Sequence, residues 1–400
     1  MTDRSPPLAL TDLAGEWAGL APAPLDARLR ELRGQGRAIL DLVTANPHEQ
    51  GLTFPGELLA EISAEAMQSI GVYRPEPRGL AAARKAVAQW YARRGSPAAA
   101  DAIQLCPGTS TGYGWALRLL AEAGDEILAP SPGYPLFDDL AAVAGLRLRK
   151  YYLRFDGGGW RHAVDEIDYQ CTARTRAVVL ISPHNPTGAM ATAEELAALA
   201  EVCRRRRLAL LFDEVFCEFR EDRAHPAPRP HGEQFPLAIT LNGCSKMLSL
   251  PGWKLAWMKV DGEPRHVRPF MTALEHLADT YLPLPDLQQA MLPALLTRGE
   301  AVIDALAGAY QQRRRTARTA LAFATDDCTA GVYLCGRLSG AYAGPGGDDQ
   351  FALDALEREG VLVHPGYFYD LPGRFVLTCI AAPETLRTGI DKLNRLAGGG

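Results

Sequence analysis

Apolar runs of strand length alternate with amphipathic runs of helical length through the middle of the chain, from about residue 46 to residue 285. The strand-like runs are residues 126–129, 177–182, 208–212 and 238–241, and the helix-like runs are residues 80–94, 112–123 and 193–206. This order is typical of α/β proteins, in which helices connect the strands of a mostly parallel sheet. The sequence therefore predicts an α/β fold with a large domain at 46–285, a mostly parallel sheet flanked by helices.

The rest of the chain has a different pattern. Helical periodicity runs through residues 287–323, short strand-like runs follow at 331–338 and 375–380, and a last helix begins near residue 384. Helices and strands that do not alternate regularly are typical of α+β domains. We expect residues 286–400, with 1–45, to form a small α+β domain. The Gly/Pro-rich stretch 224–232 is expected to be a surface loop.

Charge, cysteine spacing and hydropathy exclude several classes of protein. Lys and Arg number 42 against 47 Asp and Glu, a formal net charge of −5, and no basic stripe carries interleaved aromatics, so we expect no nucleic-acid partner. Eight cysteines occur without a CxxC pair or a Cys/His cluster at zinc spacing, which predicts no metal site and fits a reducing cytoplasm. Residues 1–10 contain no signal-like pattern and no apolar run approaches about 18 residues, so we expect neither export nor a membrane span.

Three distinctive side chains follow predicted strands. Asn185 lies in the string ISPHNPTG, Asp213 ends the apolar run in LALLFDEVF, and Lys246 lies in LNGCSKMLSLPGWKLAW. In open α/β sheets, ligands bind outside the carboxyl ends of the strands, and a carboxylate buried there requires a cationic partner. A lysine in a half-buried cleft becomes a usable amine nucleophile and base. Each residue alone also has a plainer interpretation, as a strand-ending turn, a helix cap or a solvated lysine.

A second cluster is suited to an anion. Residues 107–110, Pro-Gly-Thr-Ser, precede the predicted helix 112–123. Free N–H groups at a helix start, with the hydroxyls of Thr109 and Ser110, can converge on a phosphate, although a simple helix cap would look the same. Lys254 supplies a second positive charge close in sequence to Lys246.

Seven strings in order then resemble one family, the fold-type I, class I/II pyridoxal-phosphate (PLP) aminotransferases. The strings are GVYRPEPRGL, CPGTST, PSPGYPLF, ISPHNPTG, LFDEVF, CSKMLSLPGWKLAW and VHPGYFY. Each string is weak to moderate alone, but together they cover nearly the whole chain. The resemblance implies the PLP-transferase fold of type I.

The resemblance also implies roles for individual residues. Lys246 would carry PLP as a Schiff base, Asp213 would pair with the protonated pyridine nitrogen, and Tyr134 would stack on the ring. Asn185 would hydrogen-bond the 3′ oxygen of the ring. The residues implied at the phosphate are Gly108, Thr109, Ser110, Ser245 and Lys254.

Two further expectations concern the assembly and the substrate. Tyr73 resembles the tyrosine that reaches the phosphate of the neighbouring subunit's cofactor, so a homodimer is expected, with a core or surface tyrosine as the alternative. The candidates for substrate binding are Asn46, Asn185 and Arg374.

Three departures from the family pattern bear on the substrate. Phe216 stands where a tyrosine usually donates a hydrogen bond to the 3′ oxygen, so the Schiff base should keep its proton to higher pH. At the phosphate, Lys254 replaces an arginine and Gly243 a serine, which predicts looser cofactor binding. In GRFVLTCIAAP, Leu377 aligns with the arginine that binds the substrate's α-carboxylate, and Arg374 would point to the opposite face of the strand unless a bulge intervenes.

The sequence therefore predicts transfer of an amino group from an amino donor, expected to be an amino acid, to a 2-oxo acid, with Lys246 moving the proton. The alternatives are a PLP-dependent lyase, decarboxylase or oxidase on the same fold, or a non-catalytic PLP-binding protein. With Leu377 at the arginine position, either another group holds the carboxylate or the substrate has none. The sequence leaves this choice and the identities of donor, acceptor and pathway open.

Overall fold

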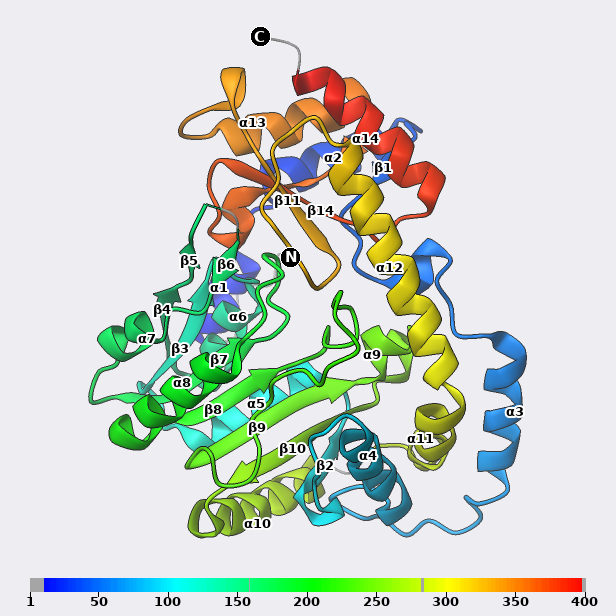
Figure 1. The fold of residues 1–400 in the computed structure, drawn as a ribbon, viewed down its shortest axis with the longest axis vertical. Coiled ribbons are helices and arrows are strands. Elements are labelled where there is room, and N and C mark those ends of the chain that lie inside the picture. Colours follow the sequence, from blue (N-terminus) through cyan, green and yellow to red (C-terminus); the bar gives the residue numbers. More distant parts are fainter. Residues whose placement is uncertain (1–10, 158, 282–283, 398–400) are drawn as a thin grey trace, which may run out of the picture.

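The structure, a computed structural model, describes residues 11–157, 159–281 and 284–397. The expectation that no export signal is present falls on residues 1–10, which lie outside the described residues. In Figure 1 a large sheet with its helices forms the lower part of the molecule, and a smaller group of helices and strands lies above it.

The large sheet has seven strands in the order β2-β10-β9-β8-β7-β3-β4. Their bounds are β2 (Ile103–Cys106), β3 (Glu126–Ser131), β4 (Arg147–Tyr152), β7 (Thr175–Ile181), β8 (Ala209–Asp213), β9 (Leu237–Gly243) and β10 (Ala256–Gly262). Only β10 runs antiparallel to its neighbours within this sheet. The predicted mostly parallel sheet of the type I PLP fold is confirmed. As a result, β2, β3, β7, β8 and β9 all end at the same edge of the sheet.

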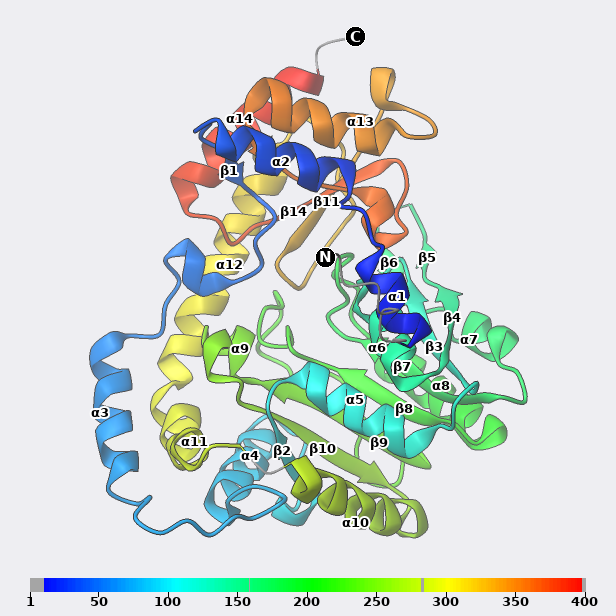
Figure 2. The same cartoon turned by 180° about the vertical axis from the view of Figure 1, so that it is seen from behind.

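Helices cover both faces of this sheet (Figures 1 and 2). One face carries α5 (Thr109–Leu120), α6 (Leu136–Ala144) and α10 (Pro264–Tyr281), and the other carries α7 (Val164–Gln170) and α8 (Ala193–Arg206). Along β7, Val179 and Ile181 pack against the first group of helices while Val178 and Leu180 pack against the second. Burial on both faces explains why the central strands are continuous apolar runs.

Local signals set the helix bounds. Thr192 and Glu195 form a reciprocal capping box at the start of α8, and arginines occupy its last turn, which stabilises both ends of the helix. The predicted bounds 193–206 are confirmed. The predicted start of helix 112–123 was wrong, because α5 begins at Thr109 directly after Gly108, which adopts a φ of 99° that favours glycine.

A helical layer borders the β2 edge of the sheet. It consists of α3 (Gly56–Met67), α4 (Ala81–Arg93) and α11 (Asp286–Arg298), and α11 packs against both α3 and α4. The predicted helical run 287–323 divides at Gly299 into α11 and α12 (Glu300–Ala320). The domain boundary after residue 285 stays a prediction, and the packing of α11 favours a boundary closer to the start of α12.

The smaller unit is built around a three-stranded antiparallel sheet in the order β11-β14-β13. These strands are β11 (Tyr333–Arg337), β13 (His364–Pro365) and β14 (Arg374–Thr378), with the pair β1 (Leu40–Asp41) and β12 (Val361–Leu362) beside them. The helices of this unit are α2 (Pro24–Gly34), α13 (Gly347–Asp354) and α14 (Pro383–Ala397), and α12 extends into it from below (Figure 1). The short strands and last helix expected from the sequence are present.

The remaining elements are short. They are α1 (Asp12–Ala18), β5 (Arg154–Phe155), β6 (Trp160–Arg161), α9 (Cys244–Met247), the 3-10 turns η1 (Pro47–Gln50), η2 (Ala100–Ala102), η3 (Pro251–Trp253), η4 (Gly340–Tyr342) and η6 (Gly366–Tyr369), and the π-helical turn η5 (Ala355–Glu359). Across the described ranges, none of the helices has the length and apolar character needed to span a bilayer.

Candidate active site

A cavity of about 350 Å³ lies at the edge where the parallel strands end, under the small unit. The side of the cavity formed by the large sheet, called the floor below, is made by Thr109, Tyr134, Asn185, Asp213 and Lys246. The opposite side, called the wall, is made by Tyr333, His364 and Tyr369.

The sheet topology places the floor residues together. Asp213 is the last residue of β8, and Lys246 lies on α9 immediately after β9. Asn185 follows β7, Tyr134 follows β3, and Thr109 follows β2 at the start of α5. Because these strands end at one edge, side chains far apart in sequence meet there, as is usual for ligand sites of α/β sheets.

Asp213 is a buried carboxylate without a cationic partner among the described residues. It accepts hydrogen bonds from the hydroxyl of Tyr113 at 2.9 Å and from the backbone N–H of Val215 at 3.0 Å. Burial raises the pKa of Asp213 to about 6, although these two donors act in the opposite direction. The floor is therefore suited to a ligand that brings a positive charge to Asp213.

Lys246 is largely enclosed, and its Nζ donates a hydrogen bond to the backbone oxygen of Ala45 at 2.9 Å. Burial lowers the pKa of Lys246 to about 8, and the carboxylate of Glu49 acts in the opposite direction. No ion pair of Lys246 is found in the described part of the chain. About a tenth of this side chain is therefore the neutral amine at pH 7, far more than for an exposed lysine, and this is the form that attacks carbonyl groups.

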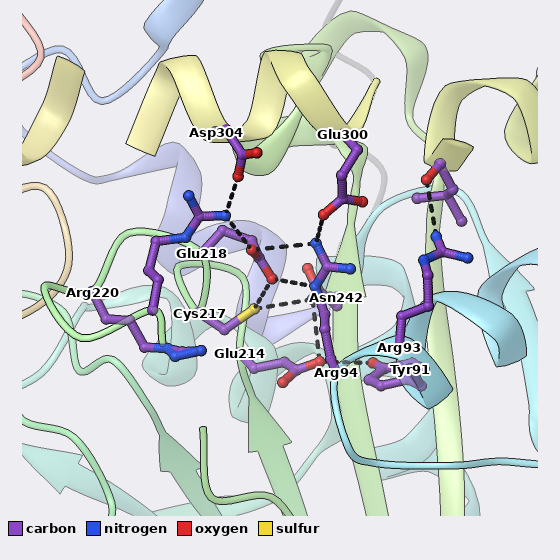
Figure 3. Close-up of polar contacts among 12 residues, drawn as sticks. Tyr91, Arg93, Arg94, Glu214, Cys217, Glu218, Arg220, Asn242, Glu300 and Asp304 are labelled. Atoms are coloured by element: carbon purple, nitrogen blue, oxygen red, sulfur yellow. Dashed lines mark hydrogen bonds and ion pairs between the residues drawn. The ribbon is translucent and has the colours of Figure 1, made fainter. Parts of the chain in front are cut away.

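Glu214, the residue after Asp213, is held in a buried polar network behind the floor (Figure 3). Its carboxylate forms an ion pair with Arg229 and accepts hydrogen bonds from Tyr91 Oη at 2.7 Å and Asn242 Nδ2 at 3.2 Å. Asn242 belongs to β9, so the network connects the ends of β8 and β9. It fixes the backbone that carries the floor carboxylate and leads to the floor lysine.

The expectation that residues 224–232 form a surface loop was wrong at Arg229. Both Arg229 and Pro230 are buried. The loop turns inward there because the buried carboxylate of Glu214 requires a cation.

The wall is aromatic and neutral. The hydroxyl of Tyr369 lies 2.9 Å from Nδ1 of His364, and burial lowers the pKa of His364 to about 4, so its imidazole is uncharged at neutral pH. Tyr333 Oη accepts a hydrogen bond from Asn185 Nδ2 at 3.3 Å, which joins the wall to the floor.

Comparison with known proteins identifies this arrangement. The sequence profile described as "Aminotransferase class I and II" matches residues 40–393. The chain belongs to this family. Class I and II aminotransferases are PLP-dependent enzymes, and the protein is a PLP-dependent aminotransferase.

Individual relatives agree with the family assignment. The glutamate–pyruvate aminotransferase of Escherichia coli K12 is 26% identical over 386 residues, 94% of either chain. The alanine aminotransferase of Mycobacterium bovis is 28% identical over 382 residues, which are 92% of this chain and 88% of that protein. An aminotransferase structure from Escherichia coli shares the fold with a TM-score of 0.84 at 24% identity, covering 98% of this chain and 99% of the other.

The floor of this aminotransferase fits PLP. Among the described residues Asp213 has no cation of the kind that a protonated pyridine nitrogen would supply, and the lowered pKa of Lys246 makes its neutral amine accessible. Asn185 Oδ1 is buried without a hydrogen-bond partner among the described residues, so the amide has hydrogen-bonding capacity left for a ligand. Tyr134 lines the same cavity and presents an aromatic ring.

The residues predicted at the phosphate lie in three places. Thr109 lines the cavity, and Gly108 and Ser110 are its neighbours in the chain. No side chain caps the start of α5. The first N–H groups of α5 and the two hydroxyls are therefore suited to a phosphate. Ser245 is half-buried beside the floor lysine, and Lys254 is exposed after η3 and does not line the cavity.

Of the remaining candidates for substrate binding and for the subunit interface, one lies in the cavity and one lies outside it. Asn46 lines the cavity, where its amide donates to Glu49 at 2.9 Å. Tyr73 lies outside the cavity with 66% of its surface exposed in the single chain.

Arg374 is not brought to the cavity. Its Nε donates to Oδ2 of the buried Asp326 at 2.8 Å, and its guanidinium packs over the rings of Phe155 and Trp160. The pairing of β14 with β11 is continuous from Thr378 to Arg374, so no bulge turns the arginine. Asp326 already neutralises this charge.

Leu377 does not face the cavity either. It packs in the core of the small unit with Phe375, whereas Val376 packs with Tyr333 and Tyr369 of the wall. Strand alternation therefore places Val376 on the face of β14 that packs behind the wall, and neither Val376 nor Leu377 lines the cavity. The described residues that line the cavity include no arginine.

Sequence reasoning missed four residues of the site. Tyr113 was hidden in a helical pattern, where nothing marks the turn of α5 that faces Asp213. His364 and Tyr369 lie in the string VHPGYFY, which contributed to the resemblance without a role, and Tyr333 lies in an ordinary strand-like run.

Proposed function

We propose that Lys246 carries PLP as a Schiff base and that Asp213 pairs with the pyridine nitrogen. The observation that carries this proposal is the placement in one cavity of a buried carboxylate, without a cationic partner among the described residues, and a lysine whose pKa is lowered to about 8. Tyr134 stacks on the ring, Asn185 binds its 3′ oxygen, and Thr109, with Gly108, Ser110, Ser245 and Lys254, holds the phosphate.

The chain's own residues then divide the work. When bound, the cofactor withdraws electrons from the carbon that loses its proton. Asp213 keeps the pyridine nitrogen protonated, because the ion pair offsets the burial of its carboxylate. With the cofactor bound, Lys246 Nζ would act as the base that accepts the proton from the substrate carbon and as the acid that returns it. The aromatic wall limits the access of water to this transfer.

The substrates are proposed to be an amino acid and a 2-oxo acid. The relatives named glutamate–pyruvate and alanine aminotransferase support this choice. The working unit is proposed to be a cytoplasmic homodimer in which Tyr73 reaches the neighbouring active site, and the exposure of Tyr73 in the single chain supports this.

A half-reaction tests the proposal. The PLP-loaded protein is mixed with L-alanine or L-glutamate without an acceptor, and the visible absorption of the cofactor is followed while the product is identified. Aminotransfer predicts loss of the visible band, one equivalent of 2-oxo acid, and return of the band on addition of pyruvate or 2-oxoglutarate. Release of ammonia with the band retained would instead indicate a lyase or an oxidase.

A further inference from the structure

Phe216 carries no hydroxyl, but Tyr333, the side chain packed against it, does. Phe216 is buried and lines the cavity. Its ring contacts the ring of Tyr333 edge to face, with centroids 5.9 Å apart and planes at 84°. Tyr333 comes from β11 and is itself 5% exposed. The two rings therefore form one surface of the cavity, and only the ring of Tyr333 can donate a hydrogen bond.

The hydroxyl of Tyr333 has unused donor capacity. It accepts the hydrogen bond from Asn185 Nδ2 at 3.3 Å, and no acceptor for its own proton is found in the described ranges. Asn185 also has unused donor capacity, because its Nδ2 carries two hydrogens and only the bond to Tyr333 Oη is found among the described residues. Two adjacent donors with unused hydrogens, one on the wall and one on the floor, indicate a site for a ligand atom that accepts hydrogen bonds.

The charges around this pair define the ligand. Among the described residues that line the cavity, Asp213 supplies the only carboxylate and Lys246 the only amine. Burial raises the pKa of Tyr369 well above its ordinary value and lowers the pKa of His364 to about 4, so both are neutral at pH 7. Arg374 is held away by Asp326. An anionic oxygen at this end of the cavity must therefore be held by neutral donors.

We infer that Tyr333 is a ligand-binding residue that, with Asn185, holds an oxygen anion and makes the hydrogen bond that Phe216 cannot make. The inference rests on the proposed function. The oxygen belongs either to the ring of the cofactor or to the carboxylate of the substrate. The chemistry is the same in both cases, a neutral hydroxyl and an amide converging on a negative oxygen.

The test compares three variants of the PLP-loaded protein. Tyr333→Phe removes the hydroxyl, and Phe216→Tyr combined with Tyr333→Phe moves it to the neighbouring ring. Tyr310→Phe is the matched control, since Tyr310 is buried in the same aromatic cluster, its hydroxyl has no partner within the described residues, and it does not line the cavity. Two quantities are measured: the pH midpoint of the visible band without substrate, and the half-saturating concentrations of L-alanine and ethylamine, which differ by a carboxylate.

Each outcome decides the matter. If the cofactor oxygen is the ligand, Tyr333→Phe raises the midpoint by about one pH unit, and the double variant restores it. If the substrate carboxylate is the ligand, the midpoint stays and the preference for L-alanine over ethylamine falls about tenfold. The inference is overturned if Tyr333→Phe changes neither quantity, or if Tyr310→Phe changes them equally. A wild-type protein that forms no visible band with PLP would instead contradict the proposed function.

Discussion

The floor and the wall of the cavity differ in charge and in origin. The floor combines a buried carboxylate, Asp213, with a half-buried amine, Lys246, both placed by strands of the large sheet. The wall consists of Tyr333, His364 and Tyr369, which come from short elements of the small unit and are neutral. The floor thus resembles a site for a fixed, charged cofactor, whereas the wall offers surface and neutral hydrogen bonds.

This difference separates two kinds of selectivity. A charged floor binds one partner strongly, because each buried charge is unfavourable until its counterpart arrives. A neutral wall discriminates among substrates by shape and by single hydrogen bonds, each of which contributes less. Changes in the floor should therefore abolish the chemistry, while changes in the wall and behind it should alter affinity or preference.

The largest effect is expected for Lys246→Ala. The variant should lose the visible band and about 10⁴-fold of turnover, because both the attachment point and the base that moves the proton are gone. Absorption spectra and steady-state rates measure this. Lys254→Ala, which changes an exposed lysine outside the cavity, should keep the band and bind the cofactor less tightly. A Lys246→Ala protein that kept both band and turnover would remove the functional difference between floor and wall.

Asp213→Asn should weaken cofactor binding about 10²- to 10³-fold, the range expected when one partner of a buried ion pair is removed. Titration of the apo-protein with PLP gives the dissociation constant. Asp139→Asn, at an exposed carboxylate on α6, is the control and should leave the constant unchanged. Equal affinities for wild type and Asp213→Asn would show that the carboxylate has no cationic ligand.

The pH dependence of cofactor attachment is the third expectation. Because the pKa of Lys246 is lowered to about 8, the neutral amine increases as the pH rises towards that value. The rate at which apo-protein forms the visible band should rise about 50-fold from pH 6 to pH 8 and then level off. Stopped-flow absorption measures it. A rise that continued unchanged to pH 10 would mean that Lys246 has the pKa of an ordinary exposed lysine.

Tyr113→Phe should have a smaller effect, about a tenfold loss of PLP affinity, because one hydrogen bond to the floor carboxylate is lost while the N–H of Val215 remains. The same PLP titration reports it. Thermal unfolding of the apo-protein shows whether the fold is intact, and a variant that folds normally and binds PLP like wild type would contradict the role of Tyr113.

The smallest catalytic effect is expected for Arg374→Ala. Since Asp326 holds this guanidinium outside the cavity, the KM for amino acids should change less than about twofold relative to carboxylate-free amines. The free energy of unfolding in urea should fall by about 2 kcal/mol, because the buried Asp326 loses a partner. A tenfold rise in KM confined to carboxylate substrates would identify Arg374 as the carboxylate-binding residue after all.

The floor could be predicted from the sequence more fully than the wall. Strands β3, β7, β8 and β9 were predictable because they are continuous apolar runs, and the floor residues lie directly after them. Strand β10 was not predicted, since its interior contains Lys259, which is fully buried and paired with Asp261. A lysine inside a central strand opposes the pattern on which strand prediction depends.

The wall could not be predicted because it depends on long-range packing. Tyr333 meets Asn185 across the chain, and no local spacing marks that contact. The inward turn of Arg229 and the outward position of Arg374 are likewise set by buried carboxylates, Glu214 and Asp326, that lie far away in sequence.

Covalent trapping tests the central claim, that Lys246 carries the cofactor, most directly. The PLP-loaded protein is reduced with borohydride and digested, and the modified lysine is located by mass spectrometry. We expect a phosphopyridoxyl group on Nζ of Lys246 and on no other lysine. Modification at Lys254 or Lys259 in its place, or a protein that binds PLP without any trapped lysine, would contradict it.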